Sequence, residues 1–198
     1  MTYLLITMPN NETLIVAEQL APSLLSKLSV SLDFINVQSI SGVDLLDSTY
    51  HNPLVPSSPE YPILPGSYVT GESGTGLVHS APGHGAEDYL LCHEHSISPF
   101  SPVDAEGRFT DAVSPNTLKG LSVLGDGNQA VIDLLTNSGS LLLQHRYTHK
   151  YPYDWRSKEP VIVRATEQWF ANVEDIKEAA ISSLKNVKMI PESGTPST

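Results

Sequence analysis

The stretch SGTGLVHSAPGHGAEDYLLCHEH, from Ser73 to His95, places two glycine-rich turns, four histidines and an acidic pair in one segment. Glycine lets the backbone approach a ligand closely and leaves N–H groups uncovered. Residues 86–95 carry acidic side chains in their first turn, which predicts a helix that begins after Gly85. The segment therefore predicts a glycine-rich loop that leads into a helix. Few other segments of the chain contain candidate catalytic or ligand-binding residues.

A metal site is the first interpretation of this segment. Its possible ligands are His79, His84, His93, His95, Cys92 and Asp88. The spacing matches neither HExxH nor a CxxC pair, and His93 and His95 diverge on a helix because they are two residues apart. A phosphate loop and a serine nucleophile fit less well, since GESGTG lacks the Walker lysine and neither Ser73 nor Ser80 lies in a GxSxG elbow. We expect no metal and no cofactor.

A ligand pocket is the interpretation that remains. Gly74 and Gly76 would bring bare backbone to the ligand, and His79 would form one wall. The positive end of the predicted helix would hold Asp88 ionised, and a fixed carboxylate is suited to bind a cation such as an ammonium group. The alternative is that Asp88 caps its own helix, and the spacing alone leaves both roles open.

The composition describes a chain that can bury a core, with 198 residues of which 40% are hydrophobic. No apolar run approaches the ~18–20 residues that span a bilayer, and the opening MTYLLITMPNN lacks the basic region of a signal peptide. Cys92 is the lone cysteine, which fits a reducing compartment. We expect one domain over residues 1–190, with residues 191–198 as a linker or ragged tail and no membrane partner.

The net charge of −11 argues against a protein that binds nucleic acid over its whole surface. One segment is nevertheless basic and aromatic; it contains Arg146, Tyr147, Lys150, Tyr151, Tyr153, Trp155, Arg156, Lys158 and Arg164. Such a mixture suits phosphate contact and base stacking. A pair of strands with a solvated basic face explains it equally well, and the composition does not separate the two.

Hydrophobic periodicity predicts further helices over residues 127–139 and 172–187, the latter with Asn172 as its N-cap. Strands are expected within residues 14–20, 31–40, 67–73, 140–149 and 159–170, and the proline-rich residues 51–66 predict an extended surface loop. Many short strands with few helices favour a mainly β fold with peripheral helices and a β-barrel core.

Two long motifs resemble the editing domain inserted into class I isoleucyl-tRNA synthetases. They are GTGLVHSAPGHGAEDY (residues 74–89) and YPYDWRSKEPVIVRATEQWF (residues 151–170). VDAEGRFT (residues 103–110) and GVDLLDSTYHNPL (residues 42–54) are similar to further blocks in the family's order. The APGHG form resembles the bacterial and mitochondrial branch, and Asp154 and Ser157, in place of the cysteines of many bacterial relatives, look mitochondrial.

The resemblance implies a site that hydrolyses valine misattached to tRNA(Ile). Asp88 matches the family aspartate that binds the α-amino group, and His79 matches the histidine that limits side-chain size. Gly74, Thr75 and Gly76 match the turn that lines the terminal adenosine site. We also expect, less specifically, that Arg146, Lys150, Arg156 and Lys158 contact the tRNA.

The resemblance further implies a threonine-rich peptide, similar to TTTPWTLPAN, that forms the other wall of the pocket. Its counterpart here is TYLLITMPNNETLIV, and aligning residues 9–11 with PAN places Thr7 and Asn11 on catalytic positions beside Asp88. Most of the family's threonines are absent from this peptide. The alternative is therefore a catalytically decayed editing domain that acts only as a tRNA-docking or structural module.

Neither a HIGH-like nor a KMSKS-like motif occurs, so the chain is not expected to charge tRNA. Its implied partners are the acceptor end of tRNA(Ile) carrying valine and the catalytic core of a parent synthetase. We expect a monomer, located in mitochondria or, alternatively, in the cytoplasm.

Overall fold

The computed structural model describes residues 1–30 and 36–191. It divides into two compact units, one from Met1 to Ala165 and one that begins at Thr166, and each is described here by itself. Within these ranges, no helix combines the length and the hydropathy needed to cross a bilayer.

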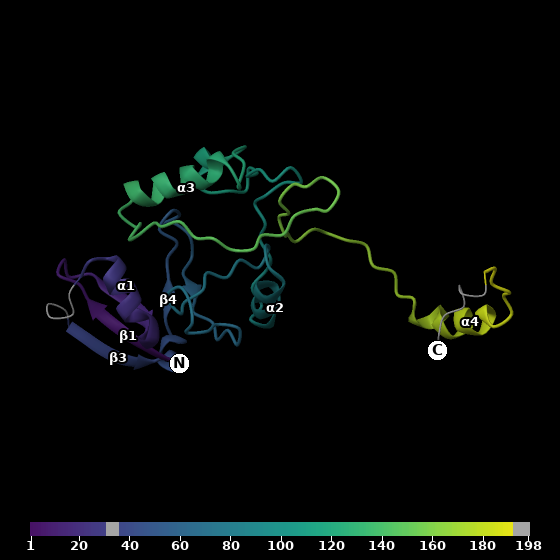
Figure 1. Cartoon of the computed structure of the whole chain (residues 1–198), viewed down its shortest axis with the longest axis horizontal. Helices are drawn as coiled ribbons and strands as arrows, with labels where there is room; N and C mark the ends of the chain where they lie inside the picture. The colour runs from purple at the N-terminus through teal and green to yellow at the C-terminus, as the bar shows by residue number, and fades with distance from the viewer. Residues whose placement is uncertain (31–35, 192–198) are drawn as a thin grey trace. The chain divides into compact units, whose positions relative to one another are not determined.

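The first unit begins with a three-stranded antiparallel sheet in the order β2-β1-β3 (Figure 1). Its strands are β1 (Thr2–Thr7), β2 (Thr13–Ala17) and β3 (Asn36–Ser41). A hairpin turn over residues 8–12 joins β1 to β2, and Asn11 adopts a φ of 68° in it, a conformation that asparagine tolerates better than most residues. The register pairs Tyr3 with Ala17 and Thr7 with Thr13.

Strand β1 packs on both faces, which explains why TYLLIT is almost continuously apolar. Side chains alternate between the faces of a strand, so Ile6 and Tyr3 belong to different clusters. One cluster of buried residues contains Ile6 and Val16 of the sheet with Ala21 and Leu25 of α1 (Ala21–Lys27). The other contains Tyr3, Ala17 and Leu45. The sheet is therefore the structural core to which later segments attach.

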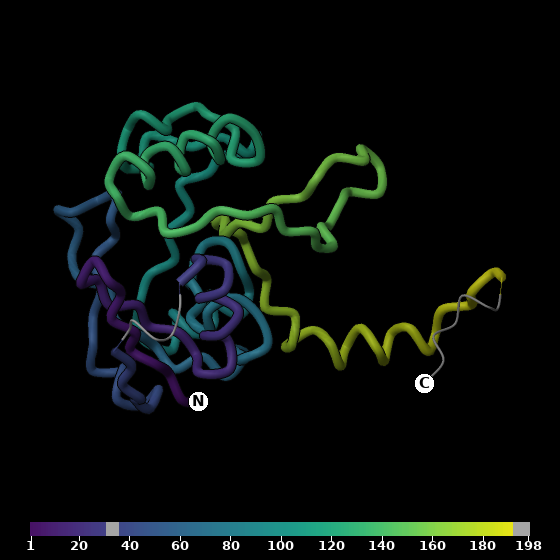
Figure 2. The backbone as a smooth tube through the Cα atoms, turned by 60° about the vertical axis from the view of Figure 1, so that its left-hand side comes forward, coloured from purple at the N-terminus to yellow at the C-terminus, as the bar shows by residue number. Residues whose placement is uncertain are grey.

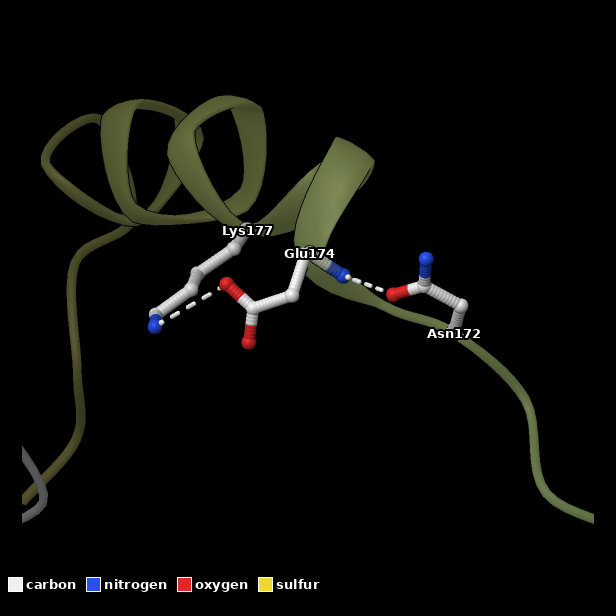
Figure 3. Close-up of polar contacts among 3 residues, drawn as sticks. All are labelled: Asn172, Glu174 and Lys177. Carbon is white, nitrogen blue, oxygen red and sulfur yellow. Dashed lines mark hydrogen bonds and ion pairs between the residues drawn. The ribbon is translucent and has the colours of Figure 1, made fainter.

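Three predicted helices are confirmed: α2 (Ala86–Glu94), α3 (Asp126–Asn137) and α4 (Glu174–Leu184). In α4 the side-chain oxygen of Asn172 accepts a hydrogen bond from the N–H of Glu174 at 3.0 Å (Figure 3). Lys177 pairs with Glu174 one turn further on, with 3.4 Å between the charged atoms. Asn172 thus satisfies an N–H of the first turn, but the N-cap residue is Val173 and not Asn172 as predicted.

The remaining regular elements are short. Strands β4 (Thr49–Tyr50) and β5 (Tyr61–Pro62) pair with each other and enclose most of the proline-rich residues 51–66, which form the predicted loop. Single turns of 3-10 helix lie at η1 (Glu18–Leu20), η3 (Gly42–Leu45) and η4 (Asn116–Leu118).

Several strand predictions are wrong. Residues 67–73, 140–149 and 159–170 form no strand, and the one β-bridge near them in the described part joins Tyr153 to Pro160. These segments have the side-chain pattern of strands, but they make at most isolated backbone hydrogen bonds, such as that from the N–H of Val161 to the carbonyl of Pro152 at 3.0 Å, and no continuous ladder. The prediction for residues 31–40 is confirmed from Asn36, whereas residues 31–35 lie outside the described residues, as does most of the predicted tail.

Over residues 1–30 and 36–191 the fold is accordingly mixed, with antiparallel sheets and four α-helices, rather than mainly β. Helix α1 was not predicted, because seven residues are too few to show a helical period. The barrel remains a prediction.

Replacing Ile6, whose side chain is fully buried, tests the sheet as the core. Ile6→Ala should lower the free energy of unfolding by about 2–5 kcal/mol, because a buried cavity replaces packed atoms. Val37→Ala, in the same sheet but 42% exposed, is the matched control and should cost far less. Urea unfolding measures both, and equal losses would contradict a core at this place.

Candidate functional site

The first glycine-rich turn of the site docks on the sheet. The N–H of Ala17 donates to the carbonyl of Thr75, and the hydroxyl of Tyr3 donates to the carbonyl of Gly76, both at 2.8 Å. Gly76 has a φ of 76°, and a Cβ atom there would clash with the Cβ of Ala17. The sequence therefore needs glycine at position 76 for two reasons, backbone conformation and close approach.

The second turn docks on another part of the same unit. The carbonyl of Gly83 accepts the N–H of Ala165 at 2.7 Å, and the ring Nδ1 of His84 lies 3.0 Å from the carbonyl of Val163. A Cβ at Gly83 would clash with the carbonyl of Phe100. The APGHG motif and the VIVRA segment, about 80 residues apart in the chain, are thus joined directly.

Asp88 lies in the first turn of α2 and fastens the loop between these two turns. Its Oδ2 accepts the N–H of Ala81 at 2.9 Å, and its Oδ1 accepts the hydroxyl of Tyr68 at 3.0 Å. The hydroxyl of Ser80 lies 3.3 Å from that of Tyr68, which it can reach as a donor because the Tyr68 proton points to Asp88. These hydrogen bonds connect Asp88 to residues outside α2, whereas a simple cap binds the backbone of its own helix.

The charge of Asp88 has no cationic partner in the described part of the chain, where the ion pairs join other residues. The charge of Asp88 affects the pKa of two neighbouring groups, the Cys92 thiol and the Tyr68 phenol. Burial, and then the charge of Asp88, raise the pKa of the Cys92 thiol, which lies one helical turn further on. Burial also raises the pKa of the Tyr68 phenol; the hydrogen bond with Ser80 opposes this, while the hydrogen bond and charge of Asp88 add to it. The carboxyl group of Asp88 thus has two hydrogen-bond donors but no ion-pair partner among the described residues.

Of the other predicted site residues, some lie beside Asp88 and others lie at the far end of β1. His79 is exposed and immediately precedes Ser80, so it lies beside the group around Asp88. Thr7 ends β1 beside the hairpin turn, with its hydroxyl 3.4 Å from that of Thr13, and Asn11 lies in the turn itself. Thr7 lies four positions along β1 from Tyr3, where the glycine turn docks, and this corresponds to roughly 13 Å of extended backbone. The sheet therefore brings Thr75 and Gly76 to one end of β1 and leaves Thr7 and Asn11 at the other.

The sequence did not reveal that Tyr68 binds Asp88, nor that Ser80 contacts Tyr68. Tyr68 is twenty residues from Asp88 and lies in a segment with the pattern of a strand, so no local spacing links the two. The predicted tRNA contacts Arg146, Lys150, Arg156 and Lys158 are all exposed, on a segment without regular structure.

A separate open hollow of about 610 Å³ lies in the same unit. It is lined by residues 104–107, 122, 124–125, 159–162 and 164. Of the predicted site residues, only Lys158 is adjacent to this lining in the sequence. The guanidinium of Arg164 on its wall donates to the carbonyl of Val103 at 3.0 Å, which holds two of its walls together.

Comparison with known proteins identifies the class as an aminoacyl-tRNA ligase segment. The chain is 49% identical over 181 residues to the isoleucine–tRNA ligase of Acaryochloris marina and 50% identical over 182 residues to that of Nostoc punctiforme, in each case 91% of this chain and 18% of the relative. It is 49% identical over 149 residues to the mitochondrial isoleucine–tRNA ligase of Schizosaccharomyces pombe, covering 75% of this chain and 15% of that relative. No family model matches the chain.

The chain is therefore homologous to a segment of isoleucine–tRNA ligase, which confirms the family that the motifs resembled. It spans less than a fifth of the length of these relatives.

Two glycines of the first turn provide a matched pair of substitutions. Gly74→Ala should cost about 1–2 kcal/mol, because φ is 70° but space is open around it. Gly76→Ala should cost roughly 1–3 kcal/mol more, because a clash with Ala17 adds to the same strain. Thermal and urea unfolding measure the difference, and equal costs would show that the turn does not press against β2.

The single cysteine reports on the charge of Asp88. Asp88→Asn should lower the pKa of Cys92 yet leave it above the ordinary value, because burial is the larger cause and persists. The pH profile of thiol alkylation measures this, with Glu87→Gln in the same helical turn as the control. A shift of the same size in both variants, or in neither, would contradict the assigned charge.

Proposed function

We propose that the chain removes valine from misacylated tRNA(Ile) by hydrolysing the aminoacyl ester, as an aminoacyl-tRNA deacylase. The observation that carries this proposal is the fixed carboxylate of Asp88, which has no cationic partner among the described residues and lies in a segment homologous to isoleucine–tRNA ligases. A β-barrel of the editing-domain type is our proposal for the complete domain.

The ligand that Asp88 suits is a protonated α-amino group. Such a group has a pKa of about 7.7–8.0, so a large fraction carries a positive charge at neutral pH. An ionised carboxylate has about four acceptor positions, and the protein uses two of those on Asp88. Asp88 therefore still has acceptor positions for an ammonium group, and its carboxylate would neutralise the positive charge of that group.

The selectivity of the proposed site follows from size. Valine lacks one methylene of isoleucine, a difference for which a pocket discriminates by only ~1–3 kcal/mol, and this pair of amino acids is the standard illustration of that limit. A second site that excludes isoleucine by size removes the remaining errors. We assign this exclusion to His79, which lies next to the Ser80–Tyr68–Asp88 group.

Hydrolysis in this proposal needs a positioned water rather than a protein nucleophile. The aminoacyl ester is already activated, so orientation by ribose hydroxyls and backbone groups supplies much of the rate. Gly74, Thr75 and Gly76 are assigned to the terminal adenosine, and the carbonyls of Thr75 and Gly76 are hydrogen-bonded to the sheet.

The partners in this proposal are tRNA(Ile) and the catalytic core of an isoleucine–tRNA ligase, and the chain acts as a monomer. A mitochondrial location is proposed because a mitochondrial relative matches at 49% identity, and the cytoplasm is the alternative.

A catalytically decayed module that docks tRNA or serves a structural purpose is the second candidate. Two observations favour it. Both oxygens of Asp88 already bind the protein, and Thr7 and Asn11 lie at the hairpin end of β1. In that case Asp88 fastens the loop and has no ligand.

Three variants separate the two candidates. Asp88→Asn should reduce deacylation of Val-tRNA(Ile) at least tenfold, because it removes the charge that binds the ammonium group. Glu87→Gln, in the same helical turn, should keep the activity. Tyr68→Phe removes a hydrogen bond to Asp88 but leaves its charge, so it should lower the melting temperature more than the activity. Equal losses of activity in Asp88→Asn and Tyr68→Phe would identify Asp88 as a structural anchor.

Selectivity is tested at His79. His79→Ala should raise hydrolysis of Ile-tRNA(Ile) relative to Val-tRNA(Ile) by roughly 10–200-fold, the range that one methylene supports. The exposed His93→Ala on α2 is the control. An unchanged ratio of the two rates would show that His79 does not exclude isoleucine by size.

A further inference from the structure

We propose that residues 53–65 form a docking segment for a protein module that binds proline-rich sequences, through a groove that is lined by aromatic rings and bordered by basic side chains. None of these residues is assigned to the aminoacyl site or to tRNA contact. The proposal is independent of the function proposed above, so either can fail without the other.

Proline recurs at every third residue of this segment. The five positions are Pro53, Pro56, Pro59, Pro62 and Pro65, so PLVPSSPEYPILP contains four overlapping copies of the pattern PxxP. A polyproline II helix has three residues per turn and rises about 3.1 Å per residue, so prolines at this interval lie along one edge, about 9 Å apart. Aromatic-lined grooves bind PxxP segments in this conformation. The interval therefore matches an established mode of peptide recognition.

Local structure explains only part of this interval. Backbone hydrogen bonds of 3.1 Å and 2.9 Å close turns over residues 52–55 and 55–58. Pro53 and Pro56 are the second residues of these turns, a position that the fixed φ of proline favours. The fourth proline belongs to β5, however, and the fifth lies outside any strand or turn. Because the same interval continues through different backbone conformations, the needs of the loop alone do not set it.

All five prolines are exposed, whereas the aliphatic residues between them are half-buried. Those residues are Leu54, Val55, Ile63 and Leu64, and Ile63 packs against the buried cluster that contains Tyr3. The segment is thus attached to the first unit through its aliphatic side chains and presents its proline rings to solvent.

Contacts at the base of the loop hold this segment in place. The hydroxyl of Thr49 donates to one carboxylate oxygen of Glu60 at 2.5 Å, and Nε2 of His51 lies 3.4 Å from the other oxygen. Figure 2 shows residues 51–65, in blue, as a tube without helical turns. A segment that is already held at its base loses less conformational entropy when it binds a partner.

The charge around the segment indicates a basic partner. No lysine or arginine occurs between Lys27 and Arg108, and the same stretch contains ten aspartates and glutamates, including Glu60 within the segment. Basic side chains beside the partner's groove would be attracted to this surface, and acidic ones would be repelled.

Two other occupants fit this surface poorly. A second copy of the chain carries the same net charge of −11 and would be repelled. A strand of another polypeptide would find few donors, because proline has no N–H with which to form a ladder. A groove that recognises proline rings needs neither opposite charge on this chain nor its N–H groups.

A purified SH3 domain is the probe that tests the proposal, because its groove is lined by aromatic rings. Two versions are compared, one with glutamates bordering the groove and one with lysines at the same places. Addition of the intact chain should shift the NMR signals of groove residues in the isotope-labelled lysine version. The affinity for this version should be higher than for the glutamate version by about tenfold or more.

Changes in the chain then locate the surface. Pro56→Ala combined with Pro62→Ala should weaken binding about tenfold or more, because two rings leave the groove. Pro99→Ala, at an exposed proline outside the segment, is the matched control and should leave the affinity unchanged. One alanine inserted between Ser57 and Ser58 keeps all five prolines but breaks their interval, so it should weaken binding to the same degree.

Proline also restricts the unfolded chain, so circular dichroism melts are measured for every variant. The insertion should keep the fold, because lengthening a surface loop costs little stability. Binding by neither version of the SH3 domain, equal binding by both, or unchanged affinity in the insertion variant would overturn the proposal. A lower melting temperature of Pro56→Ala with Pro62→Ala at unchanged affinity would show instead that the prolines only stiffen the loop.

Discussion

The two hydrogen bonds that Asp88 accepts are the interaction on which the arrangement of this site depends. They connect the first turn of α2 to the backbone of Ala81 and to the side chain of Tyr68, and so fix the loop that carries His79. Hydrogen bonds to a charged group contribute about 1.5–3 kcal/mol each, enough to hold one loop conformation. The same side chain has acceptor positions left, so anchoring the loop and binding a cation are compatible roles.

The glycine turns on either side give this loop its two supports. Gly76 rests on the sheet through Ala17 and Tyr3, and Gly83 rests on Ala165. A side chain is excluded at both glycines, by Ala17 at Gly76 and by the carbonyl of Phe100 at Gly83, so packing alone gives a reason for glycine at these two positions of the motif. Homology covers 18% of the bacterial relatives, and the proposals made here concern that segment and not the whole ligase.

Local features of the sequence predicted the parts of the structure that depend on local forces. The acidic first turn of α2 and the hydrogen bond from Glu174 to Asn172 act within a few residues, and both helix starts were recognisable, the second to within one residue of its N-cap Val173. Contacts between residues far apart in the sequence were not recognisable. Nothing in the sequence places Tyr68 against Asp88, and residues 140–149 have the pattern of a strand without a partner that would make one. The assignment of Thr7 and Asn11 to the pocket relies on a PAN-like tripeptide, which lies in the hairpin turn between β1 and β2, and it stays a prediction.

The most direct test of the account is a crystal structure of the chain with a non-hydrolysable valyl-adenosine analogue. The account predicts that the amine nitrogen of the analogue lies about 2.7–2.9 Å from a carboxylate oxygen of Asp88, with its side chain toward His79. An analogue bound elsewhere at saturating concentration, with Asp88 touching only Ala81 and Tyr68, would contradict it.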